Sequence, residues 1–177
     1  MSSSCGSVFL LVLLGVVLAS GSPHGSVSRD LTQIHDSIAN TLKLKGPEMV
    51  NELFSSVVKS INTSCQRKDL QVMNATLDIY TRIFSNILQE HHNQPGAQSL
   101  LESLSDTERV NIMEDLRYLQ QKMQTLKETL THVNHKHEDV MRKLSSIQVE
   151  DLMVQKKALA EFKEIYQAAS VVHKRCT

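Results

Sequence analysis

The stretch Val154–Val172, VQKKALAEFKEIYQAASVV, decides which architecture the chain can adopt. At helical spacing its apolar side chains fall on two adjoining stripes. The first stripe consists of Val154, Ala158, Phe162, Ile165, Ala169 and Val172, and the second of Leu152, Leu159 and Tyr166. A helix with so broad an apolar face must be covered by neighbours on more than one side. Those neighbours belong either to its own bundle, which the pattern alone favours, or to a second chain.

Glycine and proline divide the rest of the chain sharply. Beyond Gly21 they occur only at Pro23, Gly25, Gly46-Pro47 and Pro95-Gly96, and neither occurs in residues 97–177. Because both residues interrupt helices, their absence permits long helices, and no alternating β-rich run competes with them. We predict an all-α fold with six helical segments in one domain, residues 22–177.

Three of the six segments precede Pro95-Gly96. A helix over Asp30–Leu44 is ended by Gly46-Pro47, and a second helix then runs to about Ile61. A third helix begins near Asp69, a suitable N-cap residue. This third helix carries two apolar stripes, which makes it the candidate central helix. One stripe consists of Leu70, Met73, Leu77, Tyr80, Phe84 and Ile87, and the other of Val72, Ile79 and Ile83.

The other three segments follow Pro95-Gly96. Ser105 and Glu108 form a capping box at the start of a fourth helix. Its apolar seam alternates steps of four and three residues, a pattern suited to helix–helix packing. The seam consists of Ile112, Leu116, Leu119, Met123, Leu126, Leu130 and Val133. A short helix around Met141 comes next, and residues 145–148 offer a cap for the last helix, which runs to about Val172.

The amino-terminal segment indicates secretion. The apolar run Val8–Ala19 is too short to span a membrane and is followed by small residues. It predicts a signal peptide over residues 1–21, and hence a secreted, extracellular protein without membrane insertion. Lysine plus arginine and aspartate plus glutamate number 19 each, so the formal net charge is zero. A balanced charge gives no indication of nucleic-acid binding.

Two kinds of covalent modification are expected in such a compartment. Cys65 and Cys176 predict a disulfide, either within one chain or between two; the alternative is a pair of thiols that are free or separately paired. The sequons that begin at Asn62 and Asn74 predict N-glycosylation.

No catalytic or cofactor-binding constellation is recognisable. The best candidate for a metal site is the group His132, His135 and His137, with Glu138 and Asp139, since zinc accepts imidazoles. No second group of ligands occurs at a suitable spacing, so a solvated loop is the preferred interpretation. Nucleophile elbows, phosphate loops and Cys-x-x-Cys motifs do not occur. We expect neither an enzyme, nor a metal site, nor a cofactor.

Seven residues in the opening stretch resemble the signature of the type II interferons, the interferon gamma family. The pattern spans twelve residues, and all its specified positions are met, at Val154, Gln155, Lys157, Ala158, Glu161, Phe162 and Ile165. The resemblance implies a six-helix subunit that forms an intertwined homodimer, in which the last two helices of each chain pack into the partner. The apolar face of Val154–Val172 would then be buried largely by the other chain, around its third helix.

The function that the resemblance implies is that of a secreted cytokine. It would bind interferon gamma receptor chains, activate receptor-associated kinases and STAT factors, and drive antiviral and macrophage responses. The family's receptor surface uses the first helix, the loop after it and the region near the C-terminus, which here points to Lys43, Lys45, Glu48 and His173. No motif carries these four residues over, and ordinary solvated side chains are the alternative.

The family's strongly basic tail is represented here only by the short stub of residues 173–177. Such an ending is typical either of a shortened form or of a tailless branch, such as the interferon-gamma-related proteins of fishes. Two other classes of protein are alternatives. A lipid-binding amphipathic protein would need helices with a sharply polar side, whereas the third and last helices are apolar over a broad face. Helical cytokines of the interleukin-ten type normally carry more disulfides than one pair.

Overall fold

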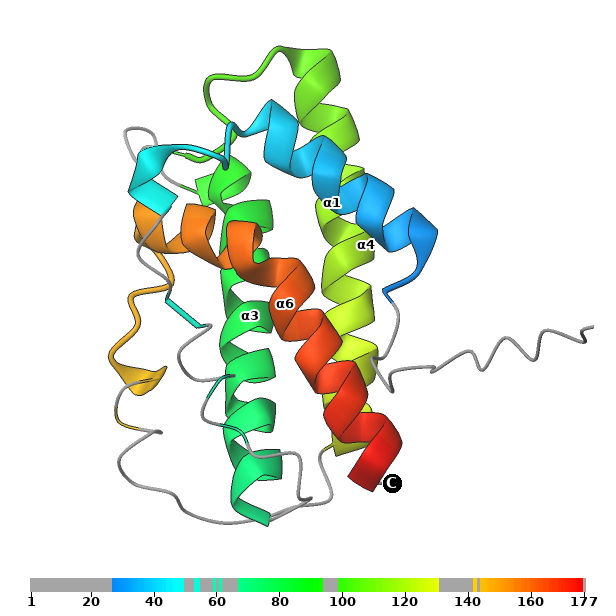
Figure 1. Ribbon diagram of the computed structural model, residues 1–177. Helices are drawn as coiled ribbons and strands as arrows, with labels where there is room; N and C mark the ends of the chain where they lie inside the picture. Colours follow the sequence, from blue (N-terminus) through cyan, green and yellow to red (C-terminus); the bar gives the residue numbers. More distant parts are fainter. Residues whose placement is uncertain are drawn as a thin grey trace, which may run out of the picture.

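The chain is described by a computed structural model at residues 27–49, 53–54, 59, 61, 67–93, 99–130, 142 and 144–176. Across these residues the regular structure is helical, without strands, so the predicted all-α class is confirmed for them (Figure 1). The elements are α1 (Arg29–Thr41), the 3-10 turn η1 (Pro47–Met49), α3 (Arg67–Asn93), α4 (Asp106–Leu130) and α6 (Leu152–Cys176). The expected second and fifth segments fall largely outside the described residues.

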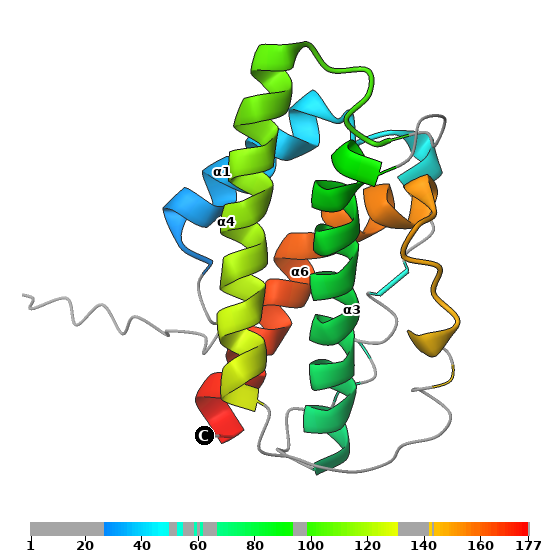
Figure 2. The same cartoon turned by 180° about the vertical axis from the view of Figure 1, so that it is seen from behind.

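The four α-helices named above form two layers. Helices α3 and α4 lie antiparallel, side by side, and make one layer (Figure 2). Helices α1 and α6 cross the other face, with α6 running diagonally over both helices of the first layer (Figure 1). The core lies between the layers, so one long face of α6 is directed at α3 and α4.

Both predicted apolar stripes of α3 are buried in this arrangement. Every residue of the two stripes is buried except Leu70, which is half-buried. Helix α4 covers one side of α3, while α6 and Phe54 cover another, where the Phe54 and Tyr80 rings lie 4.7 Å apart. The prediction of a central third helix is thus met within one chain.

The start of α4 follows the predicted capping box. The Glu108 carboxylate accepts the Ser105 backbone N–H at 3.0 Å, and Ser105 Oγ accepts the Glu108 N–H at 3.4 Å. The predicted seam is buried from Ile112 to Leu130, while Val133 lies outside the described residues. Polar contacts with α3 flank the seam, including an ion pair between Lys127 and Asp78 at 2.5 Å.

Helix α1 ends earlier than expected, and the residue that ends it is Lys43. Lys43 adopts a left-handed conformation with φ 54°. The Leu44 N–H donates to the Ala39 carbonyl at 2.9 Å and the Lys43 N–H donates to that of Asn40 at 3.3 Å, the bonding of a Schellman motif. Burial of Leu44 holds this turn in place, whereas Gly46-Pro47 lies beyond it. The prediction that Gly46-Pro47 ends the helix was therefore wrong.

The left-handed backbone conformation of Lys43 destabilises the folded protein, and glycine at this position should remove that cost. We expect Lys43→Gly to stabilise the protein by about 1 kcal/mol, because a Cβ atom disfavours left-handed backbone and glycine does not. This corresponds to roughly 2–4 °C in melting temperature for a protein of this size. Lys45→Gly is the matched control, since Lys45 is equally exposed and lacks a positive φ. If thermal unfolding showed no higher melting temperature for Lys43→Gly than for Lys45→Gly, the left-handed backbone of Lys43 would carry no measurable strain.

Three further boundaries differ from the expectation. Leu53 and Phe54 lie in a bend rather than within a second helix, although Pro47 does open the turn η1. Helix α3 begins at Arg67, so Asp69 is buried in its first turn instead of capping it. Helix α6 begins at Leu152, because the Asp151 carboxylate accepts two N–H groups of the first turn, at 2.7 and 3.0 Å. That carboxylate satisfies donors that residues 145–148 are too far away to reach.

Candidate functional site

The broad apolar face of α6 is buried by other helices of the same chain. Phe162, Ile165 and Ala169 are completely buried, and α1, α3 and α4 all contact α6. Of the two stripes defined by the sequence, only Val154, Leu152 and Tyr166 retain partial exposure. The helix therefore occupies the middle of a bundle, the arrangement that its pattern favoured.

One turn of α6, residues 158–161, anchors the helix to three other parts of the chain. The Tyr80 hydroxyl of α3 donates to the Ala158 carbonyl at 3.0 Å. His35 of α1 bonds through Nε2 to the next carbonyl, that of Leu159, at 2.8 Å. Both contacts are buried, where unpaired polar groups are costly. We call residues 158–161 the anchor turn.

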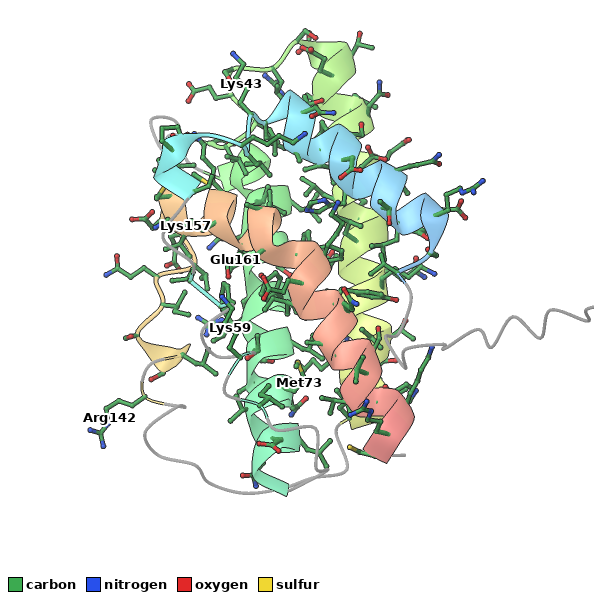
Figure 3. All side chains as sticks on the ribbon, in the orientation of Figure 1. Lys43, Lys59, Met73, Arg142, Lys157 and Glu161 are labelled. Atoms are coloured by element: carbon green, nitrogen blue, oxygen red, sulfur yellow. The ribbon has the colours of Figure 1, made fainter. Side chains whose placement is uncertain are left out.

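The third contact of the anchor turn is made by Glu161. Its two carboxylate oxygens accept the backbone N–H groups of Leu53 and Phe54, at 2.5 and 2.7 Å. Figure 3 shows Glu161 on α6, the helix that also contacts η1. Hydrogen bonds to an ionised acceptor are stronger than those to a neutral one. Glu161 thus holds a segment without regular structure against α6, and this places the Phe54 ring in the core.

Phe162 is the centre of an aromatic cluster beside the anchor turn. Its ring stacks with those of His35 and Tyr166, each at a centroid distance of 5.8 Å, and meets Phe84 edge-on at 5.9 Å. Offset-stacked and edge-to-face geometries are the favourable ones for aromatic pairs. Phe162 therefore links α1, α3 and α6.

Most of the remaining signature residues lie on the buried side of α6. Gln155 is buried and donates to the Val149 carbonyl at 3.2 Å, which secures the approach to α6. Ala158 is completely buried, and Lys157 is half-buried at the surface (Figure 3). The signature thus marks the core face and the anchors of α6.

Burial and charge shift three pKa values around the anchor turn. Burial raises the pKa of the Tyr80 hydroxyl well above its ordinary value, and the negative charges of Glu161 and Glu164 act in the same direction. Burial lowers the pKa of His35. A hydrogen bond from Lys163 lowers the pKa of the Asp36 carboxyl. Tyr80 and His35 are consequently neutral hydrogen-bonding groups at pH 7.

The four residues expected to face a receptor do not lie together. Lys43 and Lys45 are exposed on the segment that joins α1 to η1, where Lys45 Nζ donates to Asn40 Oδ1 at 3.1 Å, and Glu48 is exposed within η1. Figure 3 shows Lys43 at the end of α1. His173 lies in the last turn of α6, a helix roughly 37 Å long whose first part contacts η1. The structure thus brings three of the residues together and leaves His173 at the opposite end.

The predicted modification sites are only partly described. Asn62 and Cys65 lie outside the described residues. Asn74 is half-buried on α3, and the hydroxyl of its sequon partner Thr76 is fully buried, donating to the Val72 carbonyl at 2.9 Å. Cys176 is disulfide-bonded. Its pairing with Cys65 remains a prediction, as does glycosylation.

Searches for other kinds of site concern only the described part of the chain. There, no group of three or more histidine, cysteine or acidic side chains could hold a metal ion, and His132, His135 and His137 fall outside it. None of the helices found there has the length and apolar character needed to cross a bilayer. Residues 1–21 lie outside the described part of the chain.

Comparison of the chain with protein families, with curated proteins and with solved structures finds no match. Any assignment of function therefore rests on the local signature and on the arrangement of the helices.

Proposed function

We propose that this protein is a secreted cytokine of the type II interferon class, which acts by binding a cell-surface cytokine receptor. The observation that carries the proposal is the twelve-residue signature on α6. Its residues form the anchor turn and the aromatic cluster around which the all-helical core is assembled. Such a signature has a physical reason to recur with one fold, because Gln155, Glu161 and Phe162 each make a specific contact.

The proposed receptor surface is the exposed segment with Lys43, Lys45 and Glu48. Buried Leu42 and Leu44 fix its backbone on the bundle, so the charged side chains are held outward at a defined place. Preorganisation of this kind lowers the entropy cost of binding. Charges of both signs suit a folded protein partner, since the Glu48 carboxylate would repel a polyanion.

The proposed assembly is a homodimer that exchanges α6 between subunits. Domain swapping replaces an element by the identical element of the partner, so all contacts of the anchor turn would be preserved. The single chain already buries α6, and the exchange would supply the identical helix from the partner. Light scattering on the purified protein distinguishes the two assemblies, because a swapped dimer keeps its mass on dilution far below micromolar concentration, whereas a closed chain has the mass of a monomer.

The receptor proposal is tested by binding of fluorescently labelled protein to leukocytes of the source species. We expect saturable binding that excess unlabelled protein displaces and that the double variant Lys43→Ala, Lys45→Ala weakens at least tenfold. The double variant Lys122→Ala, Arg117→Ala on α4 is the matched control for loss of two positive charges. Unsaturable binding, together with a gain of helicity on phospholipid vesicles, would contradict the proposal and favour a lipid-binding protein.

A further inference from the structure

His35 is a buried titratable group at the contact between α1 and α6. Its ring stacks on Phe162, and its Nε2 lies 2.8 Å from the Leu159 carbonyl oxygen. Since a carbonyl oxygen only accepts hydrogen bonds, Nε2 carries the proton of the neutral ring. Nδ1 is then unprotonated, is buried and makes no hydrogen bond. A second proton could therefore be added only at Nδ1.

The charged groups around His35 disfavour protonation of Nδ1. Asp36 Oδ1 lies 3.6 Å from Nδ1, beyond hydrogen-bond distance, and the same oxygen accepts a hydrogen bond from Lys163 Nζ at 2.7 Å. The carboxylate nearest to Nδ1 is therefore already paired with Lys163, and Lys163 is itself a like charge toward an imidazolium. From α4, Asp115 interacts with Ser37, the second residue after His35. From α3, Tyr80 reaches the neighbouring Ala158 carbonyl as a neutral hydroxyl.

We propose that His35 is an acid-sensitive latch that releases α6 from α1. Addition of a solvent proton at Nδ1 places a positive charge between two packed helices, and the nearest anion, Asp36, lies 3.6 Å away and is already paired with Lys163. A buried charge that is only weakly paired is unfavourable. The helices separate at this contact, which exposes the ring to water.

The direction of the pH effect follows from the states of His35 in the folded and unfolded chain. Burial lowers the pKa of His35 below its ordinary value of 6.5, Lys163 lowers it further, and the Leu159 and Asp36 contacts oppose both. The unfolded chain therefore binds the proton more tightly. The contribution of His35 to stability is complete above pH 6.5 and is lost as the pH falls toward its folded pKa.

The carboxyl groups nearby act in a different pH range. Lys163 lowers the pKa of Asp36 below its ordinary value of 3.8, so the contribution of that ion pair is lost only in stronger acid. Burial raises the pKa of Asp115 above the same ordinary value. Its contribution to stability is therefore present in acid and is lost as the pH rises, the opposite of the Asp36 contribution.

The latch does not depend on the proposed signalling function, because α1 and α6 make this contact whichever subunit supplies α6.

The test is an NMR titration of the histidine rings in the intact secreted protein, combined with hydrogen exchange of the α1 amides. We expect His35 to titrate below pH 6.5. Exchange of residues 29–41, corrected for its intrinsic pH dependence, should accelerate as the pH falls from 7.5 to 5.5. The full acceleration is about tenfold for each pH unit by which the pKa of His35 in the folded protein lies below 6.5.

Two variants separate the latch from a purely structural role, because they must shift the titration in opposite directions. Lys163→Met frees the Asp36 carboxylate and removes the like charge, so His35 should titrate at higher pH and the acid effect should shrink. Asp36→Asn removes the anion, so His35 should titrate at lower pH and the acid effect should grow. His35→Gln retains a donor for the Leu159 carbonyl and should abolish the pH dependence of α1 exchange.

Three results would overturn the latch. They are a His35 titration at or above pH 6.5, shifts of the same sign in Lys163→Met and Asp36→Asn, and undiminished pH dependence in His35→Gln. The first two remain decisive if His35→Gln does not fold.

Discussion

Phe162→Asp is expected to leave the chain unfolded at 25 °C. The Phe162 side chain is completely buried and contacts three other aromatic rings, so its removal alone costs about 3–5 kcal/mol. The substituted carboxylate would in addition be buried without a partner. Together these terms are comparable with the entire stability of a typical domain, about 5–15 kcal/mol. Far-ultraviolet circular dichroism should show loss of most of the helical signal.

Phe162→Leu is the control for Phe162→Asp. It keeps an apolar side chain at the same position, so it should fold and lose only the ring contacts and part of the packing, about 1–2 kcal/mol. A Phe162→Asp protein that retained the helical signal and cooperative unfolding of the wild type would show that α6 is not the centre of the core. Because a swapped dimer uses the same contacts, it should be lost together with the fold.

Glu161→Ala is expected to produce the second largest loss of stability, about 3–5 kcal/mol. The substitution removes both hydrogen bonds to the Leu53 and Phe54 N–H groups, and hydrogen bonds to a charged partner contribute about 1.5–3 kcal/mol each. The Phe54 ring should then leave its place against Tyr80. Urea unfolding measures the loss, and near-ultraviolet circular dichroism reports the changed surroundings of Tyr80.

Two variants show whether the loss comes from the carboxylate. Glu161→Gln retains one acceptor oxygen without the charge and should lie between wild type and Glu161→Ala. Glu114→Ala replaces an exposed helical glutamate on α4 and should change stability by no more than about 0.5 kcal/mol. If Glu161→Ala and Glu114→Ala were equally stable, Glu161 would have no anchoring role.

The parts of the fold that follow from local chemistry could be predicted from the sequence. The absence of glycine and proline after Gly96 indicates long helices, and the Ser105–Glu108 pair marks the start of α4 because its partners are three residues apart. The α4 seam and the α3 stripes follow from helical period alone. In each case the signal lies within one segment of the sequence, either as a missing helix breaker, a local hydrogen-bonding pair or a helical period.

Other features depend on contacts between distant segments and could not be predicted. Lys43 ends α1 because the buried Leu44 side chain fixes the turn, although Gly46 has the better intrinsic propensity for an interruption. The bend at Leu53 and Phe54 depends on Glu161, more than a hundred residues away in the sequence. The roles of His35 and Tyr80 also escaped sequence analysis, because their partners are backbone carbonyls of α6, which no side-chain pattern reveals.

The central proposal, a receptor-binding cytokine of the type II interferon class, is tested most directly by STAT phosphorylation in leukocytes of the source species. Purified protein should produce a saturable dose response, and the Lys43→Ala, Lys45→Ala variant should shift it to higher concentration without loss of fold. The absence of any response to the folded wild-type protein, and to a version extended by a basic tail, would contradict the proposal. The signature on α6 would then mark a helical packing arrangement without that function.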